Sequence, residues 1–121
     1  NKMVYMAHNK SGKRVLMYTI DGEMLKESTK KCDKALGVPN SGELYLIELK
    51  GSDLKKATEQ IYETIQVLGK NINEFIIHGR IVCSKIPRPD LRSTQFVKLE
   101  RALAKGKGTL IKQSRIIEEY I

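Results

Sequence analysis

Two segments of the sequence, ELYLIELK at 43–50 and NEFIIHGRIVC at 73–83, are largely apolar at both odd and even positions. Strands of this kind are buried on both faces, as in parallel sheets covered by helices. The segment between them has apolar residues at spacings of three and four, which is typical of an amphipathic helix. Those residues are Leu54, Ala57, Ile61, Ile65 and Leu68. With Ser52 as N-cap and Gly69 as the end of the helix, the order predicts a strand, helix and strand crossover with parallel strands.

The first half of the chain is predicted to be an antiparallel meander. Residues 14–20 form a strand, and Asp21-Gly22 favours a tight turn into EMLKE. A further strand over residues 32–38 reverses at Pro39-Asn40-Ser41-Gly42 into the strand at 43–50.

The second half continues with a helix over residues 94–105, which Gly106 ends, and an edge strand at 109–113. Phe96, Leu99 and Leu103 are expected to face inward from that helix. Residues 114–121 fit either one terminal helical turn or a tail that contacts a second copy. We therefore predict one α/β domain over residues 1–121, with a central mixed sheet flanked by helices.

The net charge of +8 is concentrated in one region of the chain. From Gly79 to Arg115 there are ten basic residues and two acidic ones, so the remainder is neutral. A polyanion is the natural partner of such a region, whereas a basic surface that only maintains solubility is the alternative. No segment reaches the roughly 18 apolar residues of a membrane span, and we expect an intracellular protein, in the cytoplasm or a host-cell interior, with no membrane partner.

Strand alternation places Glu48 and Lys50 on the same face of their strand. A symmetric hairpin centred between Asn40 and Ser41 pairs residues whose numbers sum to 81, and this register puts Asp33 opposite Glu48. Two opposed carboxylates repel each other, and a divalent cation would remove the conflict. The main-chain carbonyl of Leu49 is a further possible ligand. The alternative is that Glu48 and Lys50 form a surface pair and Asp33 is a turn residue.

An aspartate followed on the next strand by Glu-x-Lys, and then directly by a helix, resembles the PD-(D/E)xK nuclease superfamily, which has the restriction-endonuclease-like fold. The motif stands here as Cys32-Asp33 and Glu48-Leu49-Lys50, and the resemblance covers about residues 13–83. It implies that Asp33 and Glu48 hold magnesium or manganese and that Lys50 orients or activates the attacking water. Gln60 matches a glutamine that some branches place near the site.

The resemblance implies a metal-dependent nuclease, and we expect a DNA endonuclease rather than an exonuclease or a ribonuclease. It would be directed by the backbone or structure of its substrate, since no base-reading element is recognisable. The expected nucleic-acid-binding residues are Arg80, Lys85, Arg88, Arg92, Lys98 and Arg101.

Two alternative functions remain open, and two further expectations concern the tail and the packing residues. The glutamate that an N-terminal helix often supplies has no clear counterpart, which makes a catalytically silent nucleic-acid-binding module the alternative function. A protein-interaction domain that docks on an acidic surface is a third. The apolar tail at 116–121 suggests a homodimer, while His78 and Tyr62 are expected to be packing residues.

Overall fold

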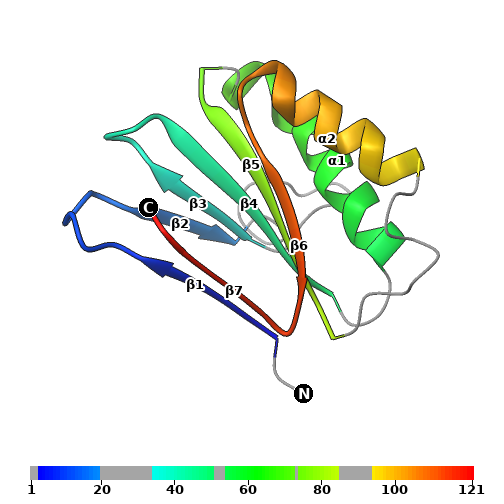
Figure 1. Cartoon of the computed structure of the whole chain (residues 1–121). Helices are drawn as coiled ribbons and strands as arrows, with labels where there is room; N and C mark the ends of the chain where they lie inside the picture. The colour runs from blue at the N-terminus through cyan, green and yellow to red at the C-terminus, as the bar shows by residue number, and fades with distance from the viewer. Residues whose placement is uncertain (1–2, 20–33, 51–53, 73, 85–93) are drawn as a thin grey trace.

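In the residues that the computed structural model describes, which are 3–19, 34–50, 54–72, 74–84 and 94–121, five strands form a central sheet (Figure 1). Their order is β2-β3-β4-β5-β6. Strands β2, β3 and β4 pair antiparallel, whereas β4, β5 and β6 pair in parallel. The bounds are β2 Leu16–Thr19, β3 Lys34–Val38, β4 Glu43–Lys50, β5 Ile76–Cys83 and β6 Leu110–Ser114. The predicted α/β class with a mixed sheet is confirmed.

The hairpin between β3 and β4 has the predicted register. Its pairs run from Val38 with Glu43 to Lys34 with Ile47, and each pair of numbers sums to 81. Gly42 has a φ of 68°, a left-handed conformation that glycine adopts without strain, and its N–H donates to the carbonyl of Val38 at 3.0 Å. The Asp21-Gly22 turn, the EMLKE segment and the Ser52 cap lie outside the described residues.

Two helices cover one face of the sheet, α1 from Leu54–Ile72 and α2 from Thr94–Lys105. Helix α2 has the predicted bounds, and Phe96, Leu99 and Leu103 are buried. Helix α1 continues past Gly69, so the predicted end was wrong by three residues. One glycine costs a helix only about 1 kcal/mol relative to alanine, which packing can offset. None of the described helices is both long and apolar enough to cross a membrane.

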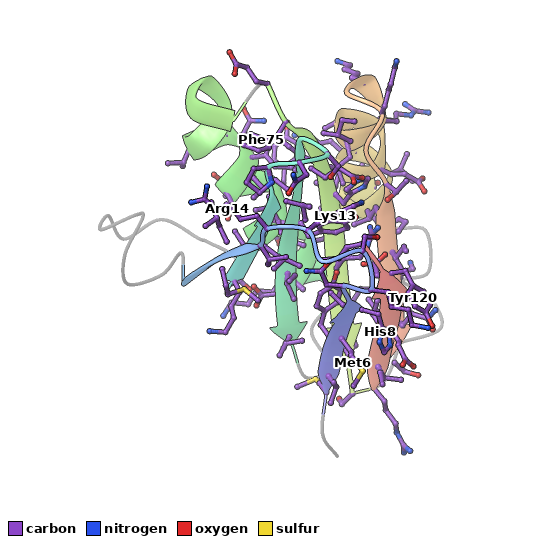
Figure 2. The ribbon with its side chains drawn as sticks, turned by 90° about the vertical axis from the view of Figure 1, so that its left-hand side faces the viewer. Met6, His8, Lys13, Arg14, Phe75 and Tyr120 are labelled. Atoms are coloured by element: carbon purple, nitrogen blue, oxygen red, sulfur yellow. The ribbon has the colours of Figure 1, made fainter. Side chains whose placement is uncertain are left out.

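The two ends of the chain form a separate ribbon. Strand β1, Val4–His8, pairs in parallel with β7, Ile116–Tyr120. Figure 2 shows His8 and Tyr120 at the far end of this ribbon, where their rings stack with centroids 4.9 Å apart. Of the two alternatives left open for residues 114–121, the terminal helical turn was therefore wrong, and β1 was not predicted at all. The homodimer through the tail stays a prediction.

Strand β4 separates two apolar cores. Leu44 and Leu46 pack with α1 and α2 on the helix side, whereas Tyr45 and Ile47 pack on the opposite side, together with residues of β1 such as Tyr5. Figure 1 shows the helices on one side of the sheet and the β1–β7 ribbon on the other. The strand is thus covered on both faces, as its apolar pattern predicted.

The turn between α2 and β6 passes very close to β5. A Cβ atom added at Gly108 would lie 1.7 Å from the carbonyl oxygen of Ile77, whereas one added at Gly106 would lie 3.9 Å from its nearest neighbour. The N–H of Gly108 also donates to the carbonyl of Leu103 at 2.9 Å. Because both contacts involve main-chain atoms, the turn has little room to move away.

We predict that Gly108→Ala lowers the free energy of unfolding by roughly 3 kcal/mol, because the carbonyl of Ile77 must be displaced. The matched variant Gly106→Ala should change it by less than about 1 kcal/mol. Urea denaturation of the two variants measures the difference, and equal midpoints would contradict the close approach.

Candidate metal and nucleic-acid site

Glu48 lies in the core near the carboxyl end of β4. Its side chain is 1% exposed, and alternation along β4 places it on the helix side with Leu44 and Leu46. Its neighbour in β5 is Ile81. The interpretation of Glu48 as half of a surface pair was therefore wrong. A carboxylate at this depth needs compensating partners, because desolvation of its charge is costly.

The other residues of the predicted centre are described to different extents. Asp33 lies outside the described residues, and the last described pair on its side of the hairpin is Lys34 with Ile47. Lys50 is the last residue of β4, and its neighbour in β5 is Cys83. The side chain of Leu49 packs in the ribbon-side core. Gln60 is half-buried on α1, and its carbonyl accepts a hydrogen bond from the hydroxyl of Thr64 at 2.7 Å.

The buried carboxylate of Glu48 fits one requirement of a magnesium or manganese centre, since both ions prefer oxygen ligands. In the part of the chain that the structure describes, no three His, Cys, Asp or Glu side chains lie together as a metal centre. The predicted second carboxylate, Asp33, falls outside that part. The pairing of Asp33 with Glu48 around a cation therefore stays a prediction.

Of the six basic residues expected to bind nucleic acid, two lie exposed on α2. These are Lys98 and Arg101, which line a groove of about 620 Å³ between α1 and α2. The ammonium group of Lys98 lies 4.5 Å from the centroid of the Tyr62 ring. Three others, Lys85, Arg88 and Arg92, lie outside the described residues.

Arg80 is the sixth, and its location argues against a role in binding phosphate. It is 3% exposed and faces the ribbon. Its guanidinium donates to both carboxylate oxygens of Glu119, at 2.7 and 3.1 Å, and to the main-chain carbonyls of Gly79 and Thr109. The predicted nucleic-acid-binding role of Arg80 is therefore corrected: its donors are engaged within the chain.

The Arg80–Glu119 pair belongs to a polar network beneath the ribbon. The hydroxyl of Tyr5 donates to Glu119 at 2.7 Å, and the guanidinium of Arg80 lies 5.3 Å from the centroid of the Tyr45 ring. Burial, reinforced by the hydrogen bond and the negative charge of Glu119, raises the pKa of Tyr5 well above its usual range. Tyr5 is thus a permanent donor to Glu119 at physiological pH.

His78 lies beside this network and is 7% exposed, as expected for a core histidine. The main-chain N–H of Thr109 donates to Nδ1 at 3.1 Å, so Nδ1 is an acceptor and the ring proton resides on Nε2. Nε2 then donates to Glu43 at 2.8 Å, and the ring stacks on Tyr45 with centroids 4.7 Å apart. His78 thereby connects the starts of β4 and β6.

Replacement of Glu119 tests the ribbon contact. Glu119→Ala leaves the charge of Arg80 buried without its partner, and we expect a loss of about 3–5 kcal/mol in the free energy of unfolding. Glu118→Ala, on the same strand but with a side chain 53% exposed, should cost less than about 1 kcal/mol. Chemical denaturation compares them, and similar losses would exclude a specific role for the buried pair.

Acidic pH should weaken the contact between Glu43 and His78. Burial alone would raise the pKa of Glu43, but the hydrogen bonds from His78 and Ser41, together with the positive charge of Lys13, outweigh burial and hold this pKa below its ordinary value of 4.5. A lowered pKa in the folded state contributes stability above pH 4.5, and that contribution is lost as the pH falls through the lowered value.

We therefore expect the stability difference between the unmodified protein and Glu43→Gln to shrink as the pH falls below about 4.5. Thermal denaturation of both proteins from pH 7 to pH 3 measures this difference. The other acidic residues are the same in the two proteins, so their contribution to stability cancels in the difference. A difference that is constant with pH would contradict the assignment.

One criterion applied to Glu48 would also have identified Arg80 and His78. All three are polar residues in strands that are apolar on both faces, so each needs a partner inside the fold. The partner of Arg80, Glu119, could not be found in this way, because it lies on another strand, 39 residues further along the chain. For the groove at Tyr62, the sequence offers only the helical spacing of the lining residues, which does not indicate a binding site.

Comparisons of the chain with models of known protein families, with curated proteins and with solved structures gave no match.

Proposed function

We propose that this chain is a metal-dependent nuclease that hydrolyses phosphodiester bonds of DNA as an endonuclease. The observation that carries the proposal is Glu48, a carboxylate buried in the core near the carboxyl end of β4. A buried acid at this position offers oxygen ligands to a cation, and the register of β3 and β4, continued by one pair beyond Lys34 and Ile47, sets Asp33 opposite Glu48. The mixed sheet with a helix directly after β4 is compatible with the restriction-endonuclease-like fold.

In this proposal Asp33 and Glu48, with the carbonyl of Leu49, hold Mg²⁺ or Mn²⁺. When bound, the ion supplies a lowered pKa for the attacking water and positive charge beside the phosphate. Lys50 orients that water and stabilises the charge that develops on the phosphate oxygens. Gln60 assists from α1. The exposed cations Lys98 and Arg101 support contact with the substrate backbone.

The test is cleavage of labelled single-stranded, duplex and branched DNA, and of RNA, with magnesium, manganese or EDTA. Asp33→Asn, Glu48→Gln and Lys50→Gln should each reduce the rate by roughly 100-fold or more, since each removes a charge at the reacting phosphate. Glu74→Gln, an exposed carboxylate before β5, is the matched control and should cleave normally. Circular dichroism confirms that each variant is folded.

A second measurement follows the ion without cleavage. Calorimetric titration with Mn²⁺ should give binding to the unmodified protein and weaker binding to Glu48→Gln. Cleavage that persists in EDTA, or that is unaffected by Asp33→Asn and Glu48→Gln, would overturn the nuclease. DNA binding with a steep salt dependence, but with no cleavage and no uptake of Mn²⁺, would instead select the catalytically silent binding module.

A further inference from the structure

One aromatic side chain, that of Tyr62, lines the groove between α1 and α2. Tyr62 is half-buried, packs against the helix-side core, and lines both this groove and an adjacent hollow of about 190 Å³. Val97 and Ala102 add apolar surface from α2. The ring is therefore held in place by the core while part of it faces the groove.

Cations line the α2 side of the groove. Lys98, Arg101 and Lys105 are spaced by three and four residues, so they share one face of the helix, and all three are exposed. No carboxylate of the described residues forms an ion pair with any of them. Glu59 and Glu63 line the adjacent hollow on α1. Negative charge is thus favoured along α2 and disfavoured along the hollow.

A row of cations beside an aromatic ring matches the two parts of a nucleotide. The phosphates of a single strand can pair with the cations while one base stacks on the ring, which is a sequence-tolerant mode of binding. An acidic peptide would satisfy the cations but offers nothing that requires the ring. The ammonium of Lys98 covers the ring at 4.5 Å through an exposed cation–π contact, which is weak enough to be exchanged for a phosphate.

The direction of the helices relates this groove to the candidate metal site. Helix α1 starts shortly after β4 ends, and α2 crosses from the carboxyl end of β5 to the start of the parallel strand β6. Both helices therefore begin at the edge of the sheet near Glu48, and Figure 1 shows them side by side. A strand that follows the groove leads toward that edge.

We propose that the groove between α1 and α2 binds single-stranded nucleic acid, with one base stacked on Tyr62 and the neighbouring phosphates held by Lys98, Arg101 and Lys105. The inference rests on the proposed function for its class of ligand, and it adds the form in which the strand is bound. It predicts that substrates with an unpaired segment bind more tightly than a continuous duplex.

Binding is measured in EDTA, without catalysis, by fluorescence anisotropy of a labelled 12-nucleotide DNA strand. Tyr62→Leu should weaken binding roughly 5- to 100-fold, whereas Tyr62→Phe should bind normally. Replacement of Lys98, Arg101 or Lys105 by Gln should each reduce the slope of log affinity against log salt by about 0.7. Lys10→Gln and Arg14→Gln, which remove equal charge elsewhere on the surface, should leave the slope unchanged.

Stacking is tested directly with Tyr62→Trp, because the sequence contains no tryptophan and the new residue would be the only one. Its emission should be quenched by the DNA strand but not by an abasic strand of the same length or by polyglutamate. Equal quenching by all three, or affinity unaffected by Tyr62→Leu, would overturn the inference, and tighter binding of polyglutamate would indicate an acidic protein partner instead. These binding measurements are made in EDTA and do not depend on cleavage, so they test the groove even if the protein proves not to be a nuclease.

Discussion

The ion pair between Arg80 and Glu119 fixes the terminal ribbon to the sheet, and the rest of the architecture depends on that attachment. Strand β4 is apolar on both faces, so the helices on one side are not sufficient to bury it. The β1–β7 ribbon supplies the second cover, with Tyr5, Ala7 and Ile117 as its inward apolar residues. A bidentate charge pair, with Tyr5 as an additional donor, supplies the directional contact that apolar packing alone does not.

The two faces of the sheet consequently differ in chemistry. Beneath the ribbon, the polar side chains pair within the chain: His78 with Glu43, and Arg80 with Glu119. Their role is therefore structural. On the helix side lie Glu48 and the groove at Tyr62, where cations are exposed to solvent. Both functional proposals therefore concern the helix side of the molecule and the edge where β4 ends.

Local patterns in the sequence were sufficient for much of this fold. The register of β3 and β4 follows from a four-residue turn, and the two-sided apolar pattern of β4 and β5 requires covered parallel strands. The burial of Glu48 follows from the same pattern. The roles of Asp33 and Lys50 at a metal centre stay predictions, because they depend on the continuation of that register.

The ribbon could not be predicted for a physical reason. Along β7 the inward positions are Ile117 and Glu119, so the usual alternation of apolar and polar residues is broken at the one residue that Arg80 requires. The count of basic residues from Gly79 to Arg115 failed for a related reason, since it treats every arginine as a surface residue. Arg80 contributes to the basic total of its region although its charge is neutralised internally.

The pairing of β1 with β7 also has a consequence for how the chain folds during synthesis. Tyr5 and Glu119 are 114 residues apart. At translation rates of about 5–20 residues per second, roughly 5 to 25 s pass between the synthesis of β1 and that of its partner strand β7. During that interval the meander and its hairpin can already form, with Tyr45 and Ile47 still uncovered. The nascent protein therefore exposes one apolar face of the sheet to the ribosome surface and to chaperones until β7 has been synthesised.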